Sequence, residues 1–95
     1  MNSRIVHPGI ILKQSFLEPL KITAYRLAKE TKISQTRISE IIQGKRAISI
    51  DTGLRLSKFF RLDDSFWLQA QMIYDIQKAK EKLEEEIEKI RPYDA

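Results

Sequence analysis

The 95-residue sequence contains no cysteine, and glycine and proline are rare. Without cysteine the chain forms neither disulfides nor thiolate metal sites, which fits a reducing cytoplasm. No apolar stretch approaches the ~20 residues that a membrane-spanning helix needs. The N-terminal stretch MNSRIVHPG also lacks the apolar run of a secretory signal. These absences predict a small cytoplasmic protein, and the scarcity of glycine and proline argues against a disordered or collagen-like chain.

Charge is distributed unevenly along the chain. Residues 1–61 contain twelve Lys or Arg and four Asp or Glu, a balance of +8. Residues 62–95 contain five against nine, a balance of −4. A basic half can attract an anionic partner such as a nucleic acid, but a solvated surface with segregated charge explains the composition equally well.

The apolar residues recur with the 3.6-residue period of helices, and no segment alternates for long as a strand would. We therefore predict an all-α protein with five helices. Pro8 suits the first turn of the first helix, and Pro19 is expected to end it. The apolar stripe of this helix consists of Ile11, Leu12, Phe16 and Leu17.

Two short helices, residues 23–31 and 34–43, are predicted in the middle of the chain. Thr23 and Ser34 can N-cap them, and Gly44 can end the second in the left-handed conformation. A tight turn of three residues joins them, which is the spacing of a helix-turn-helix motif. The residues expected to face inward from the first are Leu27, Ala28 and Thr31.

The last two helices follow a loop over residues 45–48. Ser49 or Asp51 is expected to begin the fourth helix, and Asp63 is expected to cap the fifth. The inner face of the fourth helix is expected to consist of Leu54, Leu56 and Phe59 or Phe60.

The fifth helix is expected to be long, because residues with the a/d spacing of a helix seam continue along it. These seam residues are Ile73, Ile76, Lys80, Leu83, Ile87 and Ile90. The seam favours self-association, while packing against the core and a fraying tail remain alternatives. We divide the chain into a helix-turn-helix domain, residues 1–78, and a charged C-terminal helical extension, residues 79–95.

A polar tip precedes the apolar residues of the 34–43 helix. Its isoleucines fall at helical spacing and can hold the helix on its partner. The second helix of a helix-turn-helix enters the DNA major groove with its N-terminal residues against base edges, while the first crosses the backbone. The tip is therefore suited to reading bases: Gln35 can bond adenine N6 and N7, and Arg37 can bond guanine O6 and N7 or clamp a phosphate.

The other candidate contacts surround this tip. Thr36 can contact a thymine methyl or a phosphate, the helix starting at Thr23 can hold a phosphate, and Lys45 and Arg46 can contact the backbone. Residues 21–46 contain seven basic and two acidic side chains. The candidate DNA-binding residues are Thr23, Arg26, Ser34, Gln35, Thr36, Arg37, Ser39, Gln43, Lys45 and Arg46. A rival interpretation is a helical protein-interaction module in which the seam is the functional surface and the basic face is incidental.

The sequence also resembles the HigA/VapI-type antitoxins, a branch of the Xre-like, lambda-repressor-like helix-turn-helix regulators. The matching segments are HPGIILKQSFLEPL (7–20), TAYRLAKETKISQTRISEIIQGKRAIS (23–49), and DTGLRLSKFF (51–60) with FWLQAQMIYDIQKAK (66–80). The resemblance implies a five-helix DNA-binding homodimer that binds an inverted-repeat operator and represses its own operon. It further implies a partner in a type II toxin–antitoxin module, a RelE/HigB-like mRNA-cleaving toxin that this chain neutralises.

Within the resemblance, residues 35–37 match the family's recognition tip, and Lys45 and Arg46 match its basic loop. Phe66 and Trp67 match the aromatic pair that begins the last helix. The departures are Lys32 in the turn, Arg61 where a glycine often stands, and the tail from residue 81 onward. A stand-alone Xre-family regulator without a toxin remains the alternative.

The sequence offers no catalytic or metal-binding set. His7 is the only histidine and has no cysteine to complete a ligand set, so we predict a helix N-terminal or packing role. Trp67 is predicted to anchor the core. No glycine-rich phosphate loop or nucleophile elbow is present, and we therefore predict a protein that is not an enzyme and needs no cofactor or metal.

Overall fold

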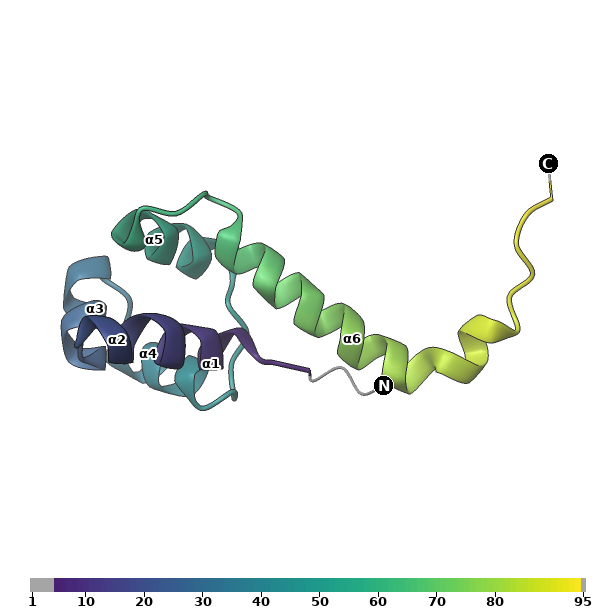
Figure 1. Cartoon of the computed structure of the whole chain (residues 1–95), viewed down its shortest axis with the longest axis horizontal. Helices are drawn as coiled ribbons and strands as arrows, with labels where there is room; N and C mark the ends of the chain where they lie inside the picture. The colour runs from purple at the N-terminus through teal and green to yellow at the C-terminus, as the bar shows by residue number, and fades with distance from the viewer. Residues whose placement is uncertain (1–4, 95) are drawn as a thin grey trace.

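The computed structural model describes residues 5–94, and these fold into helices joined by short connections (Figure 1). In chain order the elements are α1 (Pro8–Ile11), the π-helical turn η1 (Leu12–Leu17), α2 (Glu18–Leu20), α3 (Ala24–Thr31), α4 (Gln35–Ile42), α5 (Ile50–Phe60) and α6 (Phe66–Glu88). Because α1, η1 and α2 follow one another without a break, they form one continuous first helix. The all-α, five-helix prediction is confirmed, and residues 5–94 contain no strand.

Pro19 does not end the first helix, so that prediction was wrong. The helix continues to Leu20, and Lys21 terminates it in the left-handed conformation with φ 57°. A proline inside an α-helix clashes with the carbonyl four residues before it. Here the backbone N–H of Glu18 bonds to the carbonyl of Lys13, five residues back, and the wider π-turn relieves the crowding that the proline ring would cause.

The hydrophobic core receives residues from every helix. Its fully buried members are Leu12, Leu27, Ile38, Ile41, Leu56 and Trp67. The ring centroid of Phe16 lies 5.1 Å from that of Trp67 and 4.8 Å from that of Phe60. Trp67 therefore anchors α6 against the first helix, which confirms its predicted core role.

Leu54 is not part of the inner face of α5, contrary to the prediction. Its residue surface is 42% exposed, whereas Leu56 is fully buried. Two residues apart on a helix lie about 200° apart, so these two leucines cannot share one face. The buried residues of α5 are Thr52, Gly53, Leu56 and Ser57, and Phe59 and Phe60 are half-buried.

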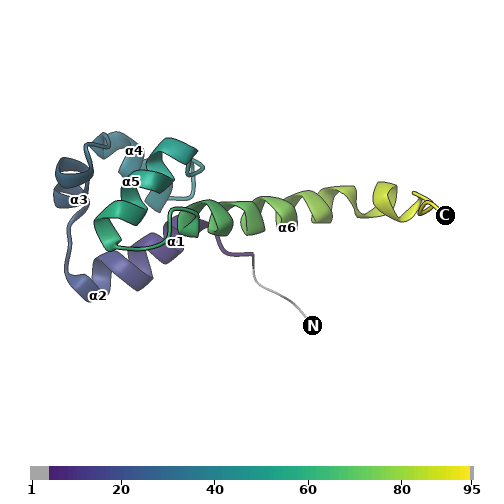
Figure 2. The same ribbon diagram turned by 90° about the horizontal axis from the view of Figure 1, so that it is seen from above.

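The last helix begins later than predicted. Its N-cap position is Ser65 and not Asp63, whose carbonyl accepts from the Phe66 N–H in a short turn before the helix. From there α6 runs to Glu88 and extends far beyond the other helices, and the molecule measures 52 × 27 × 22 Å (Figures 1 and 2). Because α6 runs across residue 78, the predicted boundary between the domain and the extension, the division of the chain into these two parts stays a prediction.

The seam of α6 does not pack against the protein's own core. Ile73, Ile76, Leu83 and Ile87 are between 43% and 57% exposed. Ile90 lies beyond the helix and is 67% exposed. The core-packing alternative is therefore wrong, and an apolar stripe faces solvent along the projecting helix. No helix within residues 5–94 is both long and apolar enough to cross a membrane.

A backbone-to-backbone contact fixes α4 against the first helix. A Cβ built on Gly9 would lie 1.8 Å from the carbonyl oxygen of Ile41. Only a residue without a side chain allows this approach. Gly9 therefore sets the depth at which α4 sits in the fold, and so how far its opposite face projects.

Candidate nucleic-acid interface

The α3 and α4 helices are joined by a tight turn at Lys32 (Figure 1). Lys32 adopts the left-handed conformation with φ 61°, a region that side chains other than glycine enter at a cost. The next residue, Ile33, is 4% exposed and anchors the turn in the core. The turn thus has helix-turn-helix geometry although a lysine, and not a glycine, occupies its left-handed position.

Both helices of the motif begin with the predicted caps. Thr23 Oγ1 accepts from the backbone N–H of Arg26 at 3.0 Å, and Ser34 Oγ accepts from that of Arg37 at 3.1 Å. Each hydroxyl takes one N–H of its first turn, and the helix dipole directs partial positive charge toward the same end. Two helix N-termini of this kind are suited to holding phosphate oxygens.

The face of α4 that points away from the core is polar. Ile38 and Ile41 are fully buried behind it, whereas Gln35 and Thr36 are exposed. At about 100° per residue, Thr36 lies opposite the buried pair, with Gln35 on one side and Arg37 on the other. Arg37 is half-buried on its flank. The three tip residues therefore form one edge of the molecule that a duplex can approach.

The outward face continues one turn further along α4. Gln43 Nε2 donates to Ser39 Oγ at 3.1 Å, so these two side chains are oriented together. Glu40, which the sequence reasoning did not select, lies on the same face and is half-buried. Its position four residues after Thr36 was the available signal, because i and i+4 share a helix face.

The loop after α4 is held at both of its ends. Gly44 ends the helix with φ 77°, as predicted. At the far end, Ile48 is buried and its backbone N–H donates to Gln71 Oε1 of α6 at 2.8 Å. Lys45 and Arg46 lie exposed between these anchors, so their side chains project from a fixed backbone.

Two of the candidate arginines are already engaged with glutamates. Arg26 Nε donates to Glu30 at 2.8 Å on α3, and Arg46 Nε donates to Glu40 at 2.7 Å. These are the two acidic residues of the 21–46 segment. The other basic residues of the segment form no ion pair within the part of the chain that the structure describes: Lys21, Lys29, Lys32, Arg37 and Lys45.

His7 has a structural role, as predicted. Its Nδ1 accepts from the backbone N–H of Gly9 at 2.9 Å and caps α1, and its ring lies edge-on to Tyr74 with centroids 4.9 Å apart. Burial lowers the pKa of His7 from its ordinary value of 6.5, although Asp75 and the Arg46 backbone oppose the shift. Among residues 5–94, no three His, Cys, Asp or Glu side chains gather as a metal site would require.

Comparison with known proteins agrees with this geometry. The Helix-turn-helix family matches residues 14–67. Virulence-associated protein I of Dichelobacter nodosus is 41% identical over 76 residues, which cover 80% of this chain and 70% of that protein. The solved structure of a HigA-family addiction module antidote protein from Coxiella burnetii has a TM-score of 0.89 and 41% identity, covering 96% of this chain and 100% of that one.

A second solved structure, the Pseudomonas aeruginosa antitoxin HigA, has a TM-score of 0.88 and 32% identity. It covers 94% of this chain and 98% of that one. The resemblance noted in the sequence is therefore confirmed over nearly the whole chain. The chain belongs to the helix-turn-helix family, on the branch of the HigA- and VapI-type antitoxins, which is a family of regulators and not of enzymes.

Proposed function

We propose that this chain is the antitoxin of a type II toxin–antitoxin module and represses its own operon by binding operator DNA through α4. The observation that carries the proposal is the exposed Gln35 and Thr36 in front of the fully buried Ile38 and Ile41. Support comes from relatives: the Pseudomonas aeruginosa HigA structure includes the higBA promoter, and antitoxin GraA, 27% identical to this chain, is in complex with its operator.

In the proposed complex, the first turn of α4 lies in the major groove. Gln35 and Thr36 face base edges, and Ser39 and Gln43 follow along the groove wall. Arg37, on the flank of the tip, reaches either a guanine or a phosphate. The remaining candidates contact the backbone: Thr23, Arg26, Ser34, Lys45 and Arg46.

We further propose that the protein acts as a homodimer in the cytoplasm, where its operator is accessible. The exposed stripe of Ile73, Ile76, Leu83 and Ile87 on α6 is the surface that favours self-association. A two-fold dimer requires an inverted-repeat operator with half-sites about 34 Å apart, one helical turn of DNA.

Operator binding is tested with a fluorescently labelled duplex taken from the promoter of the operon that contains this chain's gene. We expect affinity to fall steeply with salt, because the basic residues displace counterions from phosphates. Arg37→Ala separates the two roles of Arg37. Loss of ~1–3 kcal/mol at one base pair only indicates guanine reading, and an equal loss for every sequence indicates a phosphate contact. Absence of binding at low salt would favour the protein-interaction module instead.

The toxin part of the proposal is tested with the adjacent small open reading frame. We expect its product to be a RelE/HigB-like mRNA-cleaving toxin, and co-expression of this chain to restore growth. If no such reading frame is present, or if growth is not restored while the operator is still bound, the stand-alone regulator is the correct function.

A further inference from the structure

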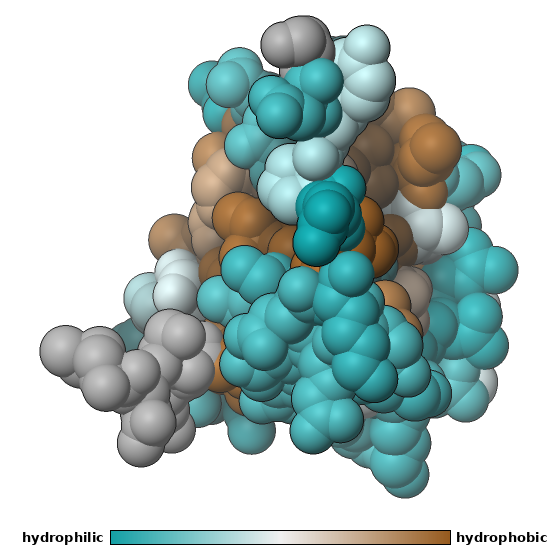
Figure 3. Space-filling model, turned by 90° about the vertical axis from the view of Figure 1, so that its right-hand side faces the viewer, coloured by the Kyte–Doolittle hydropathy of each residue, from teal (hydrophilic) through white to brown (hydrophobic). Residues whose placement is uncertain are grey.

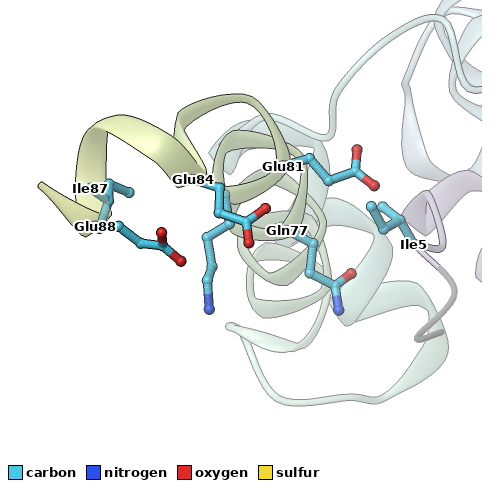
Figure 4. A pocket seen from close by; sticks show the side chains of 7 residues that line it. Ile5, Gln77, Glu81, Glu84, Ile87 and Glu88 are labelled. Atoms are coloured by element: carbon cyan, nitrogen blue, oxygen red, sulfur yellow. The ribbon is translucent and has the colours of Figure 1, made fainter. Parts of the chain in front are cut away.

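The outer half of α6 forms one wall of a groove whose opposite side is lined by Ile5, which precedes α1. The groove has a volume of about 530 Å³. Ile5 lines it on one side, and Gln77, Glu81, Glu84, Ile87 and Glu88 line it from α6 (Figure 4). Apolar and acidic side chains thus meet in a single open groove that the helix-turn-helix does not use.

The acidic residues of the groove lie on one side of α6. Glu81, Glu84 and Glu88 are spaced by three and four residues, which places them on one helix face. Residues 81–88 contain five glutamates and one lysine. All eight are exposed, and within residues 5–94 none of them forms an ion pair. Lys80 also lines the groove and is the single positive charge among the lining residues.

The groove adjoins the apolar stripe that we propose as the dimer surface and shares Ile87 with it, while its three glutamates lie outside the stripe. Glu84 follows the stripe residue Leu83 and therefore lies about 100° round the helix from it. Seen from the C-terminal end, hydrophobic surface is exposed beside hydrophilic residues (Figure 3). The α6 helix accordingly presents two neighbouring surfaces, the apolar stripe and the groove, which is lined by acidic and apolar side chains.

We infer that this groove binds a cationic, partly apolar segment of the toxin. The inference rests on the proposed function, since it assigns the toxin a surface on the antitoxin. An enzyme that cleaves mRNA must carry positive charge to hold the phosphate backbone. Glutamates on α6 complement such a surface, and the isoleucines at either end of the groove offer apolar contacts. Covering that cationic surface keeps RNA from it, which is a direct route to neutralisation.

Charge repulsion also argues against a dimer in which the groove of one copy of this chain contacts the groove of another. Two such grooves face to face would bring like charges together, and that arrangement is unfavourable at an interface. Three of the nine acidic residues of segment 62–95 line the groove.

The test compares two charge reversals on the same helix, Glu84→Lys and Glu86→Lys. Both residues are exposed and both changes add the same charge, but Glu86 lies about 200° round the helix from the groove residue Glu84. Each variant is produced in the full chain together with the protein encoded by the adjacent gene, and the affinity of the complex is measured at several salt concentrations. Operator binding and the sedimentation behaviour of the variants alone are measured in parallel.

We expect Glu84→Lys to weaken the complex by about tenfold and Glu86→Lys to leave it nearly unchanged. Operator affinity and dimer mass should stay the same in both. Equal effects of the two reversals, no effect of either, or an altered oligomeric state in Glu84→Lys would overturn the inference. If the wild-type chain binds the operator but forms no complex with the neighbouring protein, the toxin part of the proposed function fails and this inference fails with it. If the wild-type complex forms and Glu84→Lys does not weaken it, only the inference fails.

Discussion

Glu40 accepts a 2.7 Å hydrogen bond from Arg46 Nε, and this ion pair connects the outward face of α4 to the loop that follows it. Both side chains are partly exposed, so the pair contributes little to stability. The pair instead changes the electrostatic field around the proposed DNA-binding surface. In the proposed complex, Glu40 places a negative charge on the surface that faces the duplex and pairs with Arg46, one of the proposed phosphate contacts.

Replacing Glu40 by glutamine should therefore make DNA binding tighter but less selective. We expect affinity for a duplex of unrelated sequence to rise about threefold, and the dependence of log K on log salt to become steeper by about 1. The ratio of operator to non-operator affinity should fall. Fluorescence anisotropy over a salt series measures all three quantities. Glu86→Gln removes the same charge from the distant part of α6 and serves as the control, and a similar change in that variant would contradict the role of the pair.

Gly9→Ala should destabilise the protein severely, because the new Cβ would overlap the carbonyl of Ile41. A backbone atom cannot move aside as a side chain does, so we expect a loss of about 3 kcal/mol or more in the free energy of unfolding. Gly53→Ala is the comparison. Its Cβ would lie 2.9 Å from Leu68 Cδ2, the end of a side chain that can shift. Urea unfolding of both variants measures the difference in the free energy of unfolding. Equal losses would contradict the close backbone contact between Gly9 and Ile41.

Arg61→Gly should stabilise the protein. Arg61 ends α5 in the left-handed conformation with φ 58°, which costs a residue with a side chain about 1–2 kcal/mol relative to glycine. Glycine loses more entropy on folding, so we expect a net gain of about 1 kcal/mol. Lys58→Gly, inside the same helix, should instead cost about 1 kcal/mol. Thermal unfolding of the two variants tests the assignment, and a destabilised Arg61→Gly would refute it.

Stability should fall as the pH is lowered through the titration of His7. Because burial lowers its pKa below the ordinary 6.5, the folded chain binds a proton less readily than the unfolded chain. The His7 contribution is therefore fully present above pH 6.5 and is lost as the pH falls toward the lower folded pKa. Protonation also removes Nδ1 as the acceptor for the Gly9 N–H. Urea midpoints between pH 7.5 and pH 5 measure the fall, and His7→Asn, which can still cap α1, should reduce it.

The local features of the motif could be predicted from the sequence because they depend on near neighbours. Thr23, Ser34 and Gly44 end or begin helices through contacts within three residues, and each has the predicted role. The recognition of buried residues in α3 and α4 succeeded for the same reason. Periodicity alone fixes which side of a short helix is apolar.

The remaining differences come from features that the period does not encode. The wide turn before Pro19 depends on a change from α-helical to π-helical hydrogen bonding, and the residue types in this segment do not indicate that change. The helical period excludes Leu54 and Leu56 from a common face, but it does not say which of the two is buried, and the structure buries Leu56. Glu40 was missed because a glutamate was not considered as part of a surface for an anionic partner.

The central claim is that the tip of α4 faces nucleobases, and the double substitution Gln35→Ala with Thr36→Ala tests it most directly. Both residues are exposed, so the fold should be retained, and circular dichroism verifies this. The measurement is the affinity of wild type and variant for the upstream operator and for a scrambled duplex at the same salt concentration. We predict that the variant loses about tenfold or more in operator affinity and almost nothing on the scrambled duplex. An operator affinity equal to that of the wild type would contradict the claim.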